Sequence, residues 1–327
     1  MGKNYTAGDA PPAESDWEDA FRAPLAARVP LALSGLRLDQ ALARMFPQYS
    51  RNRLQAWLKA GHILVDGVHG EGSSKAIGGE RIELAPPPAP DAAMPAAQRM
   101  TLDIVFEDDD LIVVNKRAGL IVHPGAGNPD RTLMNALLAH APALRQVPRA
   151  GIVHRLDKDT SGLLVVAKNV SAQAQLAAQL ADRSVKRTYL ALVHGDPPAG
   201  GAIDAPIGRD TRVRTRMTVT QRGKEARTRY RVLERFGHAA LLECRLETGR
   251  THQIRVHLQY IRHPVVGDPV YRRGTRHAVA FARQALHAAA LEIVHPRSGK
   301  PMRWSVPLPS DMKKLVANLR RAGSGGT

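Results

Sequence analysis

The sequence predicts an α+β fold on a mainly antiparallel sheet, divided into two domains. At 327 residues the chain is longer than one ordinary small domain. The stretch PPPAPDAAMPAAQ at 86–98 is rich in proline and alanine, which is typical of a linker. Beyond it, short apolar runs separated by turn residues outnumber helical patterns. Hairpins are therefore favoured over alternating strand and helix units.

The chain before the linker is expected to form a mobile arm at 1–27 and a small domain at 28–85. Leu38, Leu42 and Met45 recur at helical spacing, and Ser50 is a candidate N-cap for a second helix that ends at Gly61. Two short strands around an Asp66-Gly67 turn and a third strand at 81–84 complete the expected elements of this domain.

The chain after the linker is expected to form a larger domain at 99–321, followed by a flexible tail at 322–327. Alternating or continuous apolar runs predict strands at 102–106, 111–115, 151–154, 162–167, 188–193, 212–220, 226–232 and 239–247. Helical spacing predicts helices at 132–141 and 171–181, one carrying Ile254 and Leu258, and a last helix that Ser310 opens after two more strands.

The chain is strongly basic. It has 47 Lys and Arg against 30 Asp and Glu, a formal net charge of +17, and a pI of about 10.6. A folded protein of this charge is expected to bind a polyanion, most commonly nucleic acid, although a solvated basic surface is the alternative. Aromatic residues make up only 4% of the chain, which argues against a surface of stacking platforms.

Basic residues concentrate in two places. If 212–220 and 226–232 form a hairpin, each strand presents three arginines on one face, and such like charges repel unless phosphates neutralise them. A solvated ribbon is the alternative. These arginines are Arg212, Arg214 and Arg216 on the first strand and Arg227, Arg229 and Arg231 on the second. A weaker RNA-facing patch in the small domain would consist of Arg37, Arg51, Arg53 and Lys59.

Composition excludes several classes of protein. A single cysteine, Cys244, rules out an internal disulfide or a cysteine-rich zinc site. No apolar run approaches the length of a membrane span, and the first residues lack a secretory h-region, so we expect a cytoplasmic protein. The acids at 107–110 could hold a divalent ion, but a hairpin turn is favoured there. With no phosphate-binding glycine loop and no zinc motif, neither a metal nor a cofactor is expected.

The stretch HRLDKDTSG at 154–162 is the strongest candidate for chemistry. Two apolar runs bracket a turn that carries His154, Arg155, Asp157 and two further charged side chains. Asp and Thr often cap turns, which is the structural alternative. However, charge concentrated beside a strand end is typical of a functional loop, and Arg155 could keep the carboxylate of Asp157 ionised and nucleophilic.

HRLDKDTSG also resembles the signature of the large pseudouridine synthase family that modifies uridines in ribosomal RNA. The similarity covers almost all of 28–315. It includes EDDDLIVVNKRAGLIVHPGAG, RTYLALV, LETGRTHQIRVHL, HPVVGDPVY and RQALHA. The small domain resembles an RNA-binding module shared with a small-subunit ribosomal protein and some tRNA synthetases. Domain order and HPGAGNPD resemble the branch acting on helix 69 of 23S rRNA. Arg117 departs from the family, which usually has proline there.

The resemblance implies a role for each matching residue. Asp157 would be the catalytic aspartate, and Tyr189 would pack on the uracil and transfer a proton. Arg250 would pair with Asp157, Ile254 would form part of an apolar wall, and Arg155 would help to open the RNA around a flipped base. These residue types suit the chemistry, because one carboxylate can attack either the sugar or the uracil ring and later leave.

The resemblance implies a cofactor-independent isomerase whose partner is large-subunit ribosomal RNA, either free or in the assembling subunit. We expect it to be a monomer with no membrane contact. Two other functions fit parts of the sequence. One is a non-enzymatic ribosome-binding or assembly factor that uses the same basic surfaces. The other is a metal-dependent nuclease built on Asp157, Asp159 and the acids at 107–110.

Overall fold

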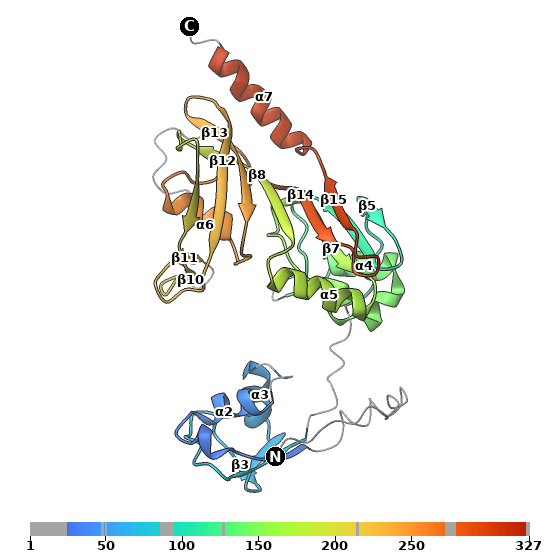
Figure 1. The fold of residues 1–327 in the computed structure, drawn as a ribbon, viewed down its shortest axis with the longest axis vertical. Helices are drawn as coiled ribbons and strands as arrows, with labels where there is room; N and C mark the ends of the chain where they lie inside the picture. Colours follow the sequence, from blue (N-terminus) through green and yellow to red (C-terminus); the bar gives the residue numbers. More distant parts are fainter. Residues whose placement is uncertain are drawn as a thin grey trace. The chain divides into compact units, whose positions relative to one another are not determined.

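The computed structural model describes residues 25–46, 49, 51–85, 95–125, 128–213, 216–271 and 279–324. The chain divides into two compact units, 1–93 and 94–327, which we describe separately (Figure 1). In the described ranges, no helix is both long enough and apolar enough to cross a bilayer.

The described part of the smaller unit is a four-stranded antiparallel sheet with two α-helices. Its elements are β1 (Leu25–Arg28), α2 (Leu38–Met45), α3 (Arg51–Lys59), β2 (Ile63–Val65), β3 (Val68–His69) and β4 (Arg81–Leu84). The strand order is β1-β4-β2-β3, and Leu42, Leu54 and Leu84 are fully buried between sheet and helices. The predicted helices and strands are confirmed. The predicted start at residue 28 is wrong, because residues 25–27 pair with β4. Ser50 lies outside the described residues.

The larger unit is built on a nine-stranded mixed sheet with the path β5-β6-β7-β14-β8-β13-β12-β9, to which β15 adds beside β14. The strands of this sheet are β5 (Ile104–Glu107), β6 (Leu111–Lys116), β7 (Ser161–Ala167), β8 (Lys186–His194), β9 (Gly200–Asp204), β12 (Arg227–Arg235), β13 (Ala239–Leu246), β14 (Leu286–Val294) and β15 (Pro301–Ser305). A separate ribbon pairs β10 (Ile207–Arg209) with β11 (Met217–Val219). The helices are α4 (Leu133–His140), α5 (Val170–Ala181), α6 (Gln253–Tyr260) and α7 (Ser310–Ser324).

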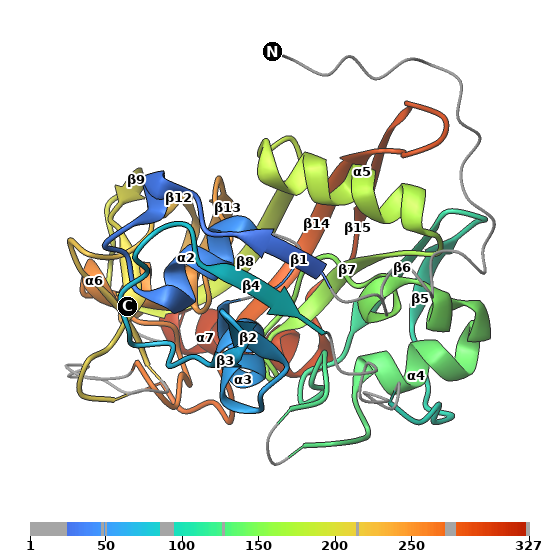
Figure 2. The ribbon, with the colours of Figure 1, turned by 90° about the horizontal axis from the view of Figure 1, so that it is seen from below.

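Strand periodicity divides the core of this unit between the two faces of the sheet. Because side chains alternate along a strand, Leu111 and Val113 of β6 pack with α5, whereas Ile112 and Val114 pack with α4. Figure 2 shows α5 and α4 on opposite sides of β6 and β7. Residues of α6 and α7 join the cluster that contains α4. Both faces are therefore covered, which explains why β6 and β7 are continuous apolar runs.

Three predictions for the larger unit are wrong. Residues 151–154 do not form a strand: a 3-10 turn, Pro148–Gly151, is followed by an isolated bridge from Ile152 to Val166. Among the described residues of the expected strand 212–220, only β11 is a strand, because Asp210 accepts hydrogen bonds from the backbone N–H groups of Arg212 and Val213 and turns the chain there. The last helix continues to Ser324, past the predicted tail boundary.

Candidate active site

The HRLDKDTSG turn lies at the start of β7, close to Tyr189 on β8. Its carbonyl and amide groups close a turn in which the N–H of Thr160 donates to the carbonyl of Asp157 at 3.1 Å. The strand that follows approaches β14 so closely that a Cβ on Gly162, whose φ is +112°, would lie 2.2 Å from the Ala288 carbonyl oxygen. Ala288 in turn pairs with Tyr189. Only one strand therefore separates the start of β7 from Tyr189, a distance of about 10 Å between their backbones.

Asp157 is held by an arginine between two carboxylates. The Nη1 of Arg255 on α6 donates to Asp157 at 2.9 Å, and its Nε and Nη2 donate to Asp268 at 2.6 and 2.9 Å. The side chain of Arg255 is 4% exposed and that of Asp268 is fully buried, whereas Asp157 is 18% exposed. Burial lowers the pKa of Arg255, but the hydrogen bonds that it donates to Asp268, together with the charges of Asp268 and Asp157, outweigh burial and raise that pKa above its ordinary value. The fork therefore presents a permanent positive charge to the carboxylate of Asp157.

The predicted pairing of Arg250 with Asp157 is wrong. Arg250 precedes α6, and its Nε donates to the carbonyl of Glu225 at 2.9 Å. Its N–H donates to the side chain of Gln253, which caps the turn that leads into the helix. Arg255 takes the pairing role because it projects from the helix itself, between the buried residues Ile254 and Val256. No local signal in the sequence distinguishes Arg255 from Arg250 as this partner, because both belong to the same stretch, TGRTHQIR.

A histidine and a tyrosine complete the surroundings of the Asp157–Arg255 pair. Nε2 of His252 lies 3.8 Å from Asp157, and its Nδ1 is hydrogen-bonded to the hydroxyl of Tyr271 at 2.9 Å. Burial lowers the pKa of His252, and Asp157 opposes this effect. Tyr271 is fully buried, with the guanidinium of Arg255 5.1 Å from its ring centroid. The guanidinium of Arg216, the residue just before β11, lies 5.3 Å from the centroid of the same ring.

A cavity of about 390 Å³ opens onto Asp157. Tyr189, Arg250, Arg155 and Ile254 all line it, so the structure brings the predicted catalytic residues and apolar wall together. Five arginines face this space, and Asp157 is the one carboxylate among its described lining residues. The arginines are Arg149, Arg155, Arg187, Arg250 and Arg255. Such a cavity attracts an anionic ligand and presents a single carboxylate to it.

Tyr189 offers a phenol to this cavity. It is 6% exposed, and burial raises the pKa of its hydroxyl, an effect to which Asp157 adds and which Arg187 opposes. The hydroxyl is therefore protonated at neutral pH. Together, a carboxylate, a protonated phenol and an apolar wall that includes Ile254 can attack a nucleoside, exclude water and move one proton.

Comparisons with known proteins agree with this geometry. A family model described as RNA pseudouridylate synthase matches residues 110–260, which include the turn, Tyr189 and Arg255, and an S4 domain model matches 36–69. "Ribosomal large subunit pseudouridine synthase D" of Nitrosomonas europaea is 53% identical over 98% of this chain and 94% of its own. The protein of the same name from Escherichia coli K12 is 48% identical over 92% of this chain and 96% of its own.

This chain belongs to the RNA pseudouridylate synthase family. It is a pseudouridine synthase, an isomerase, preceded by an S4 domain. A solved structure, "Human RNA Pseudouridylate Synthase Domain Containing 1", matches 67% of this chain and 95% of its own at 29% identity, with a TM-score of 0.52. The predicted α+β fold and reaction class are confirmed.

Lys116, which sequence analysis missed, joins the HRLDKDTSG turn of this pseudouridine synthase to the loop that follows β6. Its side chain is 2% exposed, and Nζ donates to the carbonyls of Arg117, Leu120 and Lys158 at 2.8 to 3.0 Å. The position of Arg117, where the family usually has proline, thus lies within this hydrogen-bonded loop. Burial lowers the pKa of Lys116 to about 7, against the attraction of Asp159 and Asp157.

This pKa predicts a pH-dependent stability. Between pH 7 and 10.5 the unfolded chain keeps the Lys116 proton that the folded chain loses, so the free energy of unfolding rises with pH by up to about 1.4 kcal/mol per unit. Lys116→Met should lack this rise. Urea unfolding at pH 7, 8 and 9 should show a difference between wild type and variant that widens with pH. The exposed Lys158→Met is the control, and a constant difference for Lys116→Met would contradict the prediction.

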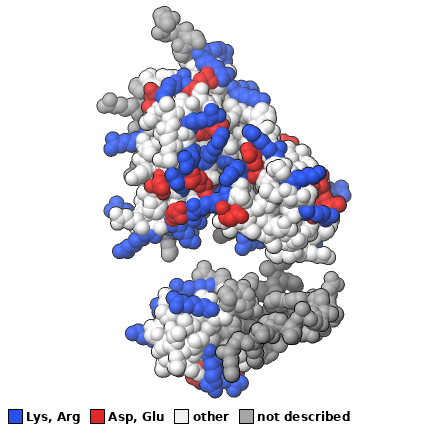
Figure 3. Space-filling model, in the orientation of Figure 1, with Lys and Arg blue, Asp and Glu red and all other residues white. Residues whose placement is uncertain are grey.

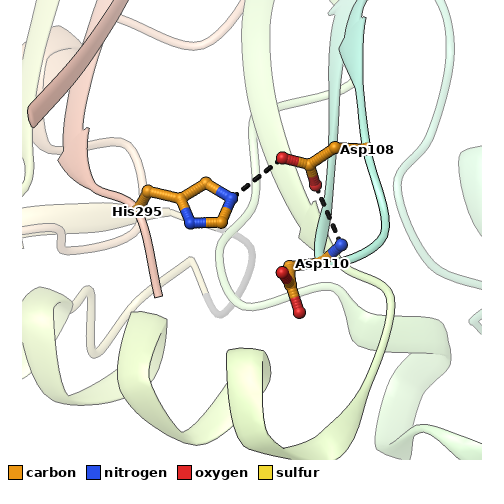
Figure 4. A group of neighbouring side chains, drawn as sticks. All are labelled: Asp108, Asp110 and His295. Atoms are coloured by element: carbon orange, nitrogen blue, oxygen red, sulfur yellow. Dashed lines mark hydrogen bonds and ion pairs between the residues drawn. The ribbon is translucent and has the colours of Figure 1, made fainter. Parts of the chain in front are cut away.

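Asp108, Asp110 and His295 form the candidate metal cluster, with ligand atoms within 4.8 Å of one another (Figure 4). Protein groups already occupy these oxygens. The carboxylate of Asp108 accepts hydrogen bonds from the backbone N–H groups of Asp110 and Leu111 and is hydrogen-bonded to the ring of His295. Arg297 contacts both oxygens of Asp110, at 2.9 and 2.8 Å. The acidic stretch is therefore a paired hairpin turn between β5 and β6, and none of these three residues lines the cavity at Asp157.

The proposed basic hairpin is wrong. β11 pairs with β10, and β12 pairs with β13 and β9. Carboxylates of the protein, rather than phosphates, neutralise the β12 arginines: Arg229 pairs with Glu247, and Arg231 with Glu243. Figure 3 shows acidic and basic side chains intermixed on the drawn face of this unit. Arg212 is exposed in a turn, Arg216 packs on Tyr271, and Arg214 lies outside the described residues.

The basic residues predicted in the S4 unit are partly paired as well. Burial would raise the pKa of Asp39, but hydrogen bonds from Arg37, Arg51 and Gln55 lower it to about 2. The two arginine side chains remain 48% and 44% exposed. Lys59 is exposed at the end of α3, and the side chain of Arg53 lies outside the described residues.

Proposed function

We propose that this pseudouridine synthase isomerises uridines of 23S ribosomal RNA, in the loop of helix 69, with Asp157 as nucleophile and without a cofactor. The observation that carries the proposal is the cavity in which one carboxylate, fixed by Arg255, faces five arginines. The names of the relatives support RNA of the ribosomal large subunit as the substrate. The resemblance of the HPGAGNPD segment and of the domain order supports the helix 69 loop as the target within it.

In this reaction the uridine leaves its stack and enters the cavity, with Arg155 at the entrance to hold the opened strand. Asp157 attacks the nucleoside, the glycosidic bond between N1 and the sugar breaks, and the uracil turns until its C5 bonds to the sugar and the carboxylate leaves. Tyr189 stacks on the freed ring and assists the transfer by which C5 loses its proton and N1 gains one, while Ile254 keeps water away from the bond that re-forms. Arg250 contributes positive charge at the cavity wall. We propose that the enzyme acts as a monomer in the cytoplasm, where its RNA substrate is made and assembled.

The direct test is to map pseudouridines at single-nucleotide resolution in 23S rRNA treated with the purified protein. New pseudouridines in the helix 69 loop, undiminished by EDTA, are the expected result. Modification only elsewhere in the RNA would overturn the target but retain the reaction. Free RNA and assembled large subunits should be compared as substrates in parallel.

We further propose that the S4 unit selects the site, through Arg37, Arg51, Arg53 and Lys59, and that Arg212, Arg214 and Arg216 add RNA contacts beside the cavity. RNA loops are recognised by shape, so a second contact region can set the register without touching the target uridine.

Deletion of residues 1–93 should therefore leave isomerisation possible but reduce site choice. The shortened protein should still modify a short stem-loop at high concentration, while it loses preference among the uridines of full-length 23S rRNA, because tethering no longer raises its local concentration. Pseudouridine mapping with both proteins measures this. A shortened protein that is folded and keeps both the full rate and the original site pattern would exclude targeting by the S4 unit.

A further inference from the structure

The segment just before the catalytic turn has an unusual backbone. Arg149 (φ 54°, ψ 32°) and Ala150 (φ 50°, ψ 40°) are both left-handed, and Gly151 follows with φ +73°. Residues other than glycine avoid this conformation because the Cβ crowds the carbonyl oxygen that follows, and they adopt it as single residues rather than in succession. The surrounding fold must therefore impose it.

Packing of the residues that follow Arg149 fixes this conformation. Ala150 is fully buried in the main core, and a Cβ on Gly151 would lie 1.8 Å from the carbonyl oxygen of Ala167, so the backbone lies directly against β7. Ile152 then bridges to Val166. Ala150 and Gly151 are buried whereas Arg149 is exposed, and its side chain lines the cavity that contains Asp157.

Arg149 joins two other groups at this wall. His123, Arg149 and Arg155 all line the cavity that contains Asp157. Burial lowers the pKa of His123, and the charges of Arg155 and Arg149 lower it further. Nε2 of His123 is buried and has no hydrogen-bond partner among the described residues. Within the described ranges, neither Arg149 nor Arg155 forms an ion pair, whereas Arg255 contacts two carboxylates. This wall therefore carries uncompensated positive charge.

We propose that Arg149, with His123 beside it, binds a phosphodiester group of the RNA strand that enters the cavity, and so positions the target uridine before Asp157. A phosphate supplies the charge and the acceptor oxygens that the two side chains lack in the protein, and a guanidinium fork matches its geometry. Arg155 strengthens the local positive field. The inference rests on the chain acting on RNA and does not require a particular uridine.

The experiment uses full-length variants whose new residues can adopt the left-handed backbone conformation of the position that they replace. Asparagine adopts the left-handed conformation more readily than most residues, so Arg149→Asn removes the charge and keeps the turn. Arg149→Lys keeps a charge without the fork. Arg131→Asn is the control, because Arg131 is also exposed and left-handed, with φ 55°, but does not line the cavity. Thermal melting verifies that each variant is folded.

Single-turnover pseudouridine formation should be measured against enzyme concentration and salt on a helix 69 stem-loop. For Arg149→Asn, the half-saturating concentration should rise about tenfold and the log–log salt slope should fall by about 0.7, the contribution of one single-strand phosphate. The maximal rate should change little. Arg149→Lys should recover part of the affinity, and Arg131→Asn should match wild type. An unchanged salt slope in folded Arg149→Asn, or equal losses in the asparagine and lysine variants, would overturn the proposal.

Uncharged methylphosphonate linkages, placed one at a time around the target uridine, identify the phosphate. At one position, the uncharged linkage should lower the RNA affinity of wild type about as much as Arg149→Asn does. The same linkage should not lower the affinity of the Arg149→Asn variant any further. If every uncharged linkage lowers the RNA affinity of wild type and of the variant equally, the proposed contact between Arg149 and a phosphate is contradicted. If wild type modifies another large-subunit RNA segment instead of this stem-loop, the proposed target fails, and the same variants are compared on that segment.

Discussion

Asp157→Asn should abolish pseudouridine formation while RNA binding stays close to that of wild type. The amide keeps the shape of the side chain and can still accept the hydrogen bond from Arg255, but it cannot act as a nucleophile. We expect a fall of at least about 10³-fold in the single-turnover rate, which corresponds to about 4 kcal/mol of activation free energy. Pseudouridine should be counted in the RNA product, with affinity measured separately by filter binding.

Asp159→Asn is the matched control for this prediction. Asp159 lies two residues away in the same turn and does not line the 390 Å³ cavity. A loss of rate in Asp159→Asn as large as that in Asp157→Asn would mean that the total charge of the turn matters, rather than one nucleophile. Substantial product from Asp157→Asn would remove Asp157 from the chemistry.

Arg255→Met should impair both stability and activity. Removing the guanidinium leaves the fully buried Asp268 and the neighbouring Asp157 without their shared partner, which we expect to cost about 3–5 kcal/mol of folding stability. The rate should fall at least about 10²-fold, because Asp157 loses the hydrogen bond that orients it. Urea unfolding and single-turnover kinetics measure the two effects.

A double variant separates the structural effect from the catalytic one. Arg255→Met with Asp268→Asn removes the buried unpaired charge, so most of the stability should return, while Asp157 stays unsupported and the rate stays low. Arg250→Met is the control and should be much milder in both measurements, since Arg250 contacts a carbonyl and not Asp157. Recovery of the rate in the double variant would show that Arg255 acts only through folding.

The wrong predictions share a physical origin. Alternation in 212–220 satisfies the pattern of a strand, but Asp210 caps the preceding turn, and β12 finds its partners in β9 and β13. Alternation specifies which side chains share a face and not which strand lies next to them. The strands β9 and β10 were missed for a related reason: they are short, contain glycine, and depend on β12 and β11 for pairing.

The sequence by itself determined the two-unit α+β organisation, the long apolar strands such as β6 and β7, and the turn that carries Asp157. These follow from local periodicity, from turn residues and from a dense motif, all of which lie within a few residues of one another. Only the tertiary structure decided which arginine pairs with Asp157, because that choice joins residues 98 positions apart and depends on the direction in which α6 points Arg255. The same holds for Asp268, Lys116 and Arg149, whose roles come from burial and from long-range packing that no local pattern encodes.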